Sequence, residues 1–238
     1  MIIRIFFAAI LAGIVAGIFY TGAQAVKVVP IIIEAEAYEN GGETLENHSH
    51  ATEAEGQTAH EHDPEAWAPQ DGFERTFYSL ISNVLVGVAY SLLLVAAIVL
   101  SKMPLSPKVG IAWGAAGFVV FVLAPSLGLP PEVPGTVAAS VPDRQAWWLA
   151  TVIMTAGGLA LFAFKTQWYW LALGLVLIVA PHVYGAPEPV HHASLAPANL
   201  AVEFVVAAIV TSGLFWLVLG GVLGWFLPKA LENQSESA

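Results

Sequence analysis

The chain contains no cysteine and only three methionines, so the soft sulfur ligands of proteins are almost missing. Cu(I) handling depends on thiolate and thioether ligands, and the sequence therefore argues against that function. Without cysteine there are also no disulfide bonds, even on an oxidising side of a membrane. Any metal chemistry must come from imidazole nitrogen and carboxylate oxygen.

Charged residues are also scarce, at 11% of the chain against 57% hydrophobic residues. Soluble domains carry about 25% charged residues, so the composition indicates an integral membrane protein. Apolar runs long enough to cross a hydrocarbon layer of ~30 Å recur along the chain. The predicted fold is all-α, a polytopic bundle of about six transmembrane helices. The expected spans are residues 2–26, 77–100, 109–127, 146–164, 168–184 and 203–227.

The fifth span is the weakest, because it is short and closes with Pro181 and His182. If this segment were re-entrant and did not cross the membrane, the last helix would run in the opposite direction. Short cytoplasmic loops are enriched in lysine and arginine, so the distribution of these residues tests the number of spans. With the N-terminus inside, five of the eight basic residues fall on the cytoplasmic side, and we expect six spans with both termini cytoplasmic. Those five are Arg4, Lys102, Lys108, Lys165 and Lys229.

The first span has a second interpretation, as a cleaved signal peptide. Arg4, an apolar run and Ala23-Gln24-Ala25 match the three parts of such a peptide. Small residues at positions 9, 13, 17 and 21 favour retention, because such a stripe lets helices pack closely in lipid. The expected organisation is a first helix within 1–33, an extracytoplasmic loop at 34–76, a helical membrane domain at 77–228 and a tail at 229–238.

The predicted loop carries most of the negative charge of the chain, with twelve acidic residues and one basic residue between 34 and 75. With few apolar residues it cannot bury enough surface to offset the entropy of ordering, so we expect its middle to be disordered. The stretch HSHATEAEGQTAHEHD at 48–63 contains two His-x-His pairs, and imidazole is a common transition-metal ligand. The predicted ligands are His48, His50, His60, His62 and Asp63. The alternative is a solvated acidic spacer.

Two segments echo each other 56 residues apart, LAPSLGLPPEVPG at 123–135 and VAPHVYGAPEPV at 179–190. The alignment pairs Pro125 with Pro181 and Glu132 with Glu188, and each copy ends a helix that runs outward. Transporters are often built from repeats with a site where the repeats meet. Alternatively, proline-rich turns at helix ends simply look alike.

Ionisable residues at membrane depth are the remaining candidates, because they are costly there and tend to serve a pathway. We predict a metal pocket that contains Glu132, His182, Glu188 and Glu203. The alternative for Glu203 is an interfacial position favoured by a helix N-terminus. Asn83, Thr151 and Thr155 are expected mainly to bond neighbouring helices.

Sequence signatures of enzymes are missing: there is no G-x-x-x-x-G-K-[ST] loop, no G-x-S-x-G elbow and no H-E-x-x-H helix. We therefore expect no enzyme, no permanently bound cofactor and no nucleic-acid partner. If the chain moves an ion, the driving force comes from a gradient, the membrane potential or a partner.

Several long segments in order resemble the CbtA family of proposed bacterial cobalt transporter subunits. They are MIIRIFFAAILAGIVAGI, EAEAYE, HEHDPEAWAPQDGFERT, LAPSLGLPPEVPG, RQAWWLAT and PHVYGAP. The resemblance implies a component of Co²⁺ uptake for cobalamin biosynthesis in the bacterial inner membrane. It also implies a partner of the CbtB type, a small single-span membrane subunit that carries histidines. The family is described with fewer spans than six.

Two functions therefore stay open. In the first, the loop collects Co²⁺ and the helices pass it inward. In the second, the chain is a non-conducting metal-binding scaffold or sensor in a membrane complex. The metal is open as well, because His/Glu sites hold Ni²⁺ or Zn²⁺ at least as readily as Co²⁺.

Overall fold

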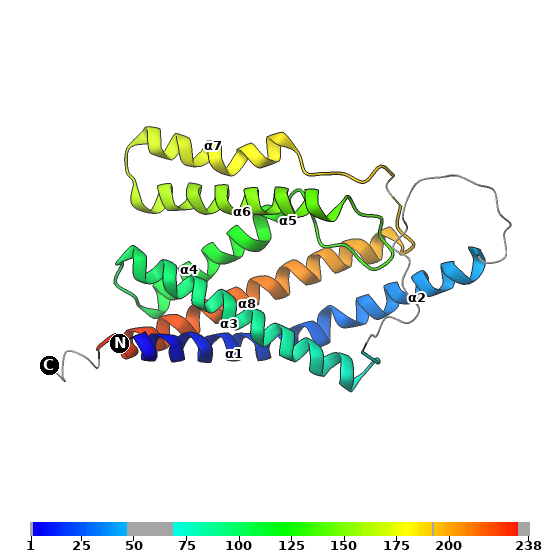
Figure 1. Ribbon diagram of the computed structural model, residues 1–238, viewed down its shortest axis with the longest axis horizontal. Helices are drawn as coiled ribbons and strands as arrows, with labels where there is room; N and C mark the ends of the chain where they lie inside the picture. Colours follow the sequence, from blue (N-terminus) through cyan, green and yellow to red (C-terminus); the bar gives the residue numbers. More distant parts are fainter. Residues whose placement is uncertain (1, 47–68, 192, 233–238) are drawn as a thin grey trace.

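The computed structural model describes residues 2–46, 69–191 and 193–232, and within these ranges every regular element is a helix (Figure 1). The elements are α1 (Ile2–Lys27), α2 (Val29–Glu46), α3 (Phe73–Ser101), α4 (Pro107–Phe118), the π-helix η1 (Val119–Leu123), α5 (Ala124–Ser126), α6 (Val141–Phe164), α7 (Trp168–Tyr184) and α8 (Ala198–Glu232). Because α4, η1 and α5 follow one another without a break, they form one apolar helix, Pro107–Ser126. The predicted all-α membrane bundle is confirmed.

Each of the six expected spans corresponds to a helix. Five helices of the described chain are long and apolar enough to cross a membrane, and the sixth, Trp168–Tyr184, has 17 residues. At 1.5 Å per residue, α7 is about 25 Å long, close to the lower limit for a hydrocarbon layer of ~30 Å. The weakest span by sequence is thus also the shortest of the six helices that correspond to expected spans. The chain is a multi-pass membrane protein.

The helices give the bundle two distinct ends. The termini end is where α1 begins and α8 ends, and the loop end is where α5 and α7 end and α6 and α8 begin (Figure 1). Because the helices alternate in direction, the five basic residues assigned to one side of the membrane all lie at the termini end. That arrangement agrees with an even number of crossings.

The contact between α1 and α3 depends on the stripe of small residues predicted from the sequence. Ala9, Gly13, Gly17 and Thr21 are all buried. A Cβ atom on Gly17 would lie 2.6 Å from the Cα atom of Val84, and one on Gly13 would clash with the backbone of Val88. The two backbones therefore approach each other directly, as expected for helix packing in lipid.

A second close approach joins α4 and α8. A Cβ atom on Gly220 would lie 2.8 Å from the Cα atom of Gly114, and one on Gly224 would lie 3.0 Å from that of Gly110. Beside this contact, Trp216 is 2% exposed. Its ring centroid lies 4.8 Å from that of Tyr90. The centre of the bundle is therefore filled by apolar and aromatic side chains.

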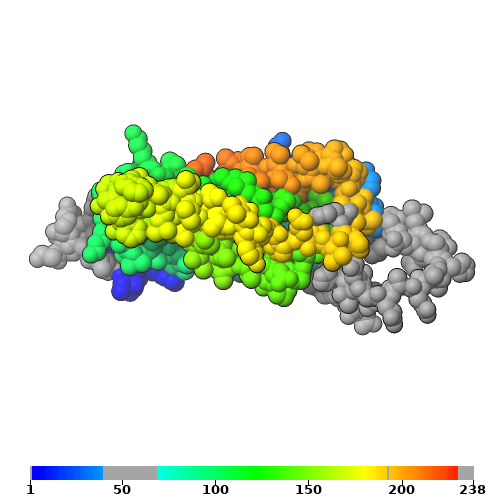
Figure 2. Space-filling model, turned by 90° about the horizontal axis from the view of Figure 1, so that it is seen from above, coloured from blue at the N-terminus to red at the C-terminus, as the bar shows by residue number. Residues whose placement is uncertain are grey.

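Helices α6 and α7 form a hairpin at the side of this group. A Cβ atom on Gly158 would lie 2.6 Å from the carbonyl oxygen of Gly174, so these two helices also approach closely. The hairpin joins the rest of the bundle mainly where α6 meets η1 and α5. Figure 2 shows α7 at the surface over most of its length, with the following segment continuing toward the loop end.

Helix α2 was not expected from the sequence. It restarts one residue after α1, at the point where Pro30 cannot donate a backbone hydrogen bond. Together the 26 and 18 residues of α1 and α2 span about 65 Å, far more than a bilayer core, so α2 extends beyond the bundle (Figure 1). The first part of the segment assigned to the acidic loop is thus helical. The middle of that segment, with its expected disorder, lies outside the described residues.

Candidate functional site

The two echoing segments meet at the loop end. Pro125 lies in α5 and Pro181 in α7, so each copy does close a helix, as predicted. The chain after each of these helices then pairs with the other: Val137 donates its N–H to the carbonyl oxygen of Ala193 at 3.0 Å, beside a bridge between Thr136 and Ser194. Segments 56 residues apart in the alignment therefore build one surface.

Glu132 follows α5 and is held by an arginine of α6. The Nη2 atom of Arg144 lies 2.9 Å from Oε2 of Glu132, and the two side chains are 32% and 31% exposed. Both line a cavity of about 430 Å³ together with Gln145 and Trp148. Sequence reasoning placed Glu132 in a metal pocket but gave Arg144 no role beyond its charge. The two residues are twelve positions apart with a loop between them, so no local sequence pattern indicated that they would pair.

His182 lies near the end of α7, where its ring contacts that of Trp147 on α6. Its ring centroid lies 5.8 Å from that of Trp147, edge to face. The indole N–H of Trp147 donates to the carbonyl oxygen of Pro181 at 3.2 Å. The Nε2 atom of His182 is buried and has no hydrogen-bond partner among the described residues. An imidazole nitrogen in this position can take part in a hydrogen bond or bind a metal ion.

The first two turns of α6 thus contact both of the echoing segments. Arg144 and Trp147 are three residues apart and lie one helical turn from each other. One holds Glu132 and the other contacts His182. Ser140 fixes the start of the helix, because its hydroxyl oxygen accepts the N–H of Asp143. The sequence RQAWW therefore positions two of the predicted ligands.

The remaining predicted ligands lie on other segments. Glu188 is exposed in the segment after α7, and Glu203 is exposed on α8. Within the described chain, no group of three or more His, Asp or Glu side chains is close enough to hold a metal ion. The four predicted pocket residues are therefore not gathered into one ligand set, and their role stays a prediction. His48, His50, His60, His62 and Asp63 lie outside the described residues.

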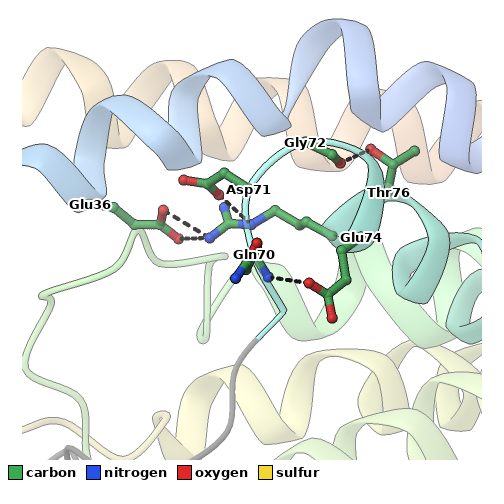
Figure 3. Close-up of polar contacts among 7 residues, drawn as sticks. Glu36, Gln70, Asp71, Gly72, Glu74 and Thr76 are labelled. Atoms are coloured by element: carbon green, nitrogen blue, oxygen red, sulfur yellow. Dashed lines mark hydrogen bonds and ion pairs between the residues drawn. The ribbon is translucent and has the colours of Figure 1, made fainter.

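A further polar cluster, not predicted, joins α2 to the start of α3 (Figure 3). The Nη2 atom of Arg75 donates to both carboxylate oxygens of Glu36, at 2.9 and 3.0 Å. Its Nε atom lies 3.0 Å from Oδ1 of Asp71. The pair of Arg75 and Glu36 therefore joins the beginning of the predicted loop segment 34–76 to its end.

Beneath Arg75, polar side chains continue between α1 and α3. A cavity of about 230 Å³ there is lined by residues that include Gln24, Thr76 and Ser79. The amide of Asn83 donates to Oε1 of Gln24 at 2.6 Å and to the hydroxyl of Thr21 at 3.0 Å. Asn83 therefore joins two helices, as expected from the sequence. Thr151 instead bonds the carbonyl oxygen of Trp147 within its own helix.

Comparison with known proteins supports one family. A family model described as "Probable cobalt transporter subunit (CbtA)" matches residues 2–228, nearly the whole chain. No curated protein and no solved structure matches the chain. The match extends from the first turn of α1 to the last turns of α8, and so covers the bundle, the segment between α2 and α3, and the RQAWW turn of α6. The chain belongs to the CbtA family of probable cobalt transporter subunits.

Proposed function

We propose that this chain is the membrane subunit of a divalent-metal uptake system, with Co²⁺ as its main substrate. The observation that carries the proposal is the family match over residues 2–228 of a chain with five long apolar helices. In this proposal the protein lies in a bacterial inner membrane, with the termini end in the cytoplasm and the loop end outside. It carries out no enzymatic reaction and holds no permanent cofactor.

The distribution of charge supports uptake from the loop end. The basic side chains Arg4, Lys102, Lys108, Lys165 and Lys229 belong to the termini end. The acidic residues of α2, of the start of α3 and of the segments that follow α5 and α7 belong to the loop end. Such a separation raises the local concentration of cations at the acidic face and speeds their association. A cation would therefore arrive where Glu132 and His182 lie.

Capture and passage are assigned to different residues. His48, His50, His60, His62 and Asp63 collect Co²⁺ in the segment that α2 leads into and α3 leads out of. The ion then passes to the loop end of the bundle, where Glu132, His182, Glu188 and Glu203 replace part of its water. Imidazole and carboxylate ligands suit a divalent ion of this kind.

The family description as a subunit implies partner subunits. We infer a small single-span subunit of the CbtB type, with histidines of its own, as the partner that completes the pathway. The accumulated cobalt would supply cobalamin biosynthesis. A transmembrane gradient, the membrane potential or the partner would drive the movement.

A second function is favoured by the centre of the bundle. Trp216, Tyr90 and Phe121 pack together there, and the ring centroids of Phe121 and Trp216 are 5.5 Å apart. These rings offer no imidazole or carboxylate ligand to a passing ion. The chain would then be a non-conducting scaffold or sensor that binds metal and holds a partner. Ni²⁺ or Zn²⁺ as the substrate is the alternative for either function.

Transport of radioactive Co²⁺ into proteoliposomes separates these functions. Vesicles contain the chain alone, the chain with its single-span partner, or no protein. Accumulated ion that is released by a divalent-cation ionophore has crossed the membrane, whereas bound ion that a chelator outside removes has not. Ionophore-releasable Co²⁺ supports the permease subunit. Chelator-removable Co²⁺ alone, with and without the partner, supports the scaffold, and competition by Ni²⁺ and Zn²⁺ ranks the metals.

A further inference from the structure

The ion pair of Glu132 and Arg144 forms part of the wall of a cavity at the loop end that is open to its surroundings. The cavity of about 430 Å³ is bounded by Pro130, Pro131, Gln145 and Trp148 in addition to the pair. The contact consists of a single short distance, 2.9 Å between Nη2 and Oε2. One guanidinium thus neutralises the carboxylate that faces this space.

The cavity is large enough for a metal ion that keeps its water. Six waters at about 30 Å³ each occupy about 180 Å³, well below the cavity volume. A hydrated divalent cation can therefore reach Glu132 before it loses any ligand. Gln145 is a polar side chain on the same wall, and its amide oxygen can accept a hydrogen bond from coordinated water.

We propose that Arg144 is a resident counter-cation, which an arriving hydrated divalent cation displaces from Glu132 in this cavity. The inference rests on the proposed function, in which Glu132 is a ligand of the passing metal. A partly exposed ion pair is weak, because water screens it and ordering two long side chains costs entropy. The exchange therefore needs little free energy, and the guanidinium keeps Glu132 neutralised while no metal is bound. Arg144 acts through Glu132 and is a positioning residue.

The inference predicts opposite effects at the two partners. In Arg144→Gln the carboxylate has no competing cation, so half-saturating Co²⁺ falls by about two- to fivefold, the range set by a pair worth up to ~1 kcal/mol. The maximal uptake rate does not rise, since tighter binding does not speed release. Arg144→Lys keeps a cation beside Glu132 and stays near the wild-type value. Glu132→Gln raises half-saturating Co²⁺, and adding Arg144→Gln to it changes nothing further.

Equilibrium binding of Co²⁺ to the full chain in lipid nanodiscs gives the measurement, expressed per folded molecule. It is made in the native chain and in a background where His48, His50, His60 and His62 are alanine, so that capture by those histidines does not hide the cavity. Lys27→Gln is the matched control, because Lys27 is an exposed cation of the same end. It should leave binding unchanged.

The outcomes distinguish this inference from the proposed function. If Glu132→Gln weakens binding but Arg144→Gln does not tighten it, the counter-cation role is wrong and Glu132 still stands as a ligand. An equal effect of Lys27→Gln would show a general surface-charge effect and would also overturn the inference. If Glu132→Gln has no effect, both the inference and the assignment of Glu132 as a ligand fail.

Discussion

The indole N–H of Trp147 on α6 donates a hydrogen bond to the carbonyl oxygen of Pro181 on α7, at 3.2 Å. This bond joins the two helices of the hairpin at the residue before His182, whose ring lies edge to face with that of Trp147. The buried Nε2 atom of His182 has no partner within the described chain. A buried imidazole nitrogen without a hydrogen-bond partner, beside a helix contact fixed by Trp147, is suited to bind a ligand.

The first prediction follows from that nitrogen. His182→Ala should reduce the maximal rate of Co²⁺ uptake by more than about tenfold even at saturating metal, since loss of an outer-shell partner alone costs ~10–100-fold. His182→Gln keeps a coordinating oxygen and should retain partial activity. Uptake is normalised to the amount of protein inserted in the membrane, because a structural histidine would change that amount and not the rate per molecule.

The control for this prediction is a histidine of the same end. His191 is exposed in the segment after α7 and belongs to none of the predicted sites. His191→Ala should leave both the rate and the insertion unchanged. A normal rate per molecule for His182→Ala would contradict the proposed role of His182.

The second prediction concerns the contact of α1 with α3. Gly17→Ala should lower the free energy of unfolding by about 1–3 kcal/mol, because the added Cβ meets backbone atoms of Val84 and the backbones must move apart. Gly22→Ala, on the same helix, adds a Cβ with nothing within 4 Å. It should be neutral or slightly stabilising. Reversible unfolding in mixed micelles measures both, and equal losses would show that the close approach does not matter.

The third prediction separates capture from passage. Changing His48, His50, His60 and His62 together to alanine should raise half-saturating Co²⁺ more than it lowers the maximal rate, since a capture segment helps most when ions are scarce. Ligation needs unprotonated imidazole, so the advantage of the native segment should fade as the pH falls below about 6.5. Uptake at limiting and saturating Co²⁺ across this pH range is the measurement.

A matched variant tests whether any change in this segment has the same effect. Asn47, Ser49, Thr52 and Thr58 are polar residues interspersed with the histidines. Their replacement by alanine should leave uptake at limiting metal unchanged. If the histidine variant behaves like this control, the segment is a solvated acidic spacer.

The spans were predictable because each depends on a local apolar run, and the stripe on α1 was visible as small residues four apart. Gly220 and Gly224 on α8 carry the same spacing and give the same signal. Helix α2 was missed for a physical reason. Its buried Ile31 and Ala35 pack in one cluster with Val133 and Leu200, which are far away in the sequence. The acidic composition of the segment showed no sign of that contact.

The site was only half predictable for a similar reason. Composition and the proline echo pointed to Glu132 and His182, but not to the side chains that hold them. Arg144 and Trp147 reach these residues from α6 across two loops, so no periodicity links them. The ion pair of Arg75 and Glu36 likewise joins residues that are 39 positions apart in the sequence. Such pairs follow from how the helices are packed, which local patterns do not specify.

The last prediction tests the orientation in the membrane. The chain has no cysteine, so a single introduced cysteine is its only thiol. Leu105 lies between α3 and α4, and Leu231 lies in the last turn of α8, so both belong to the termini end. In intact cells, Leu105→Cys and Leu231→Cys should both resist an impermeant thiol reagent, while Gly56→Cys should react. Permeabilised cells provide the control, in which all three should be labelled.

Labelling of position 231 but not 105 would contradict the packing of α8 against α4, because it requires α7 to turn back without crossing. Labelling of both would keep the fold and reverse its orientation, so that the acidic end would face the cytoplasm and the proposed direction of metal movement would be wrong.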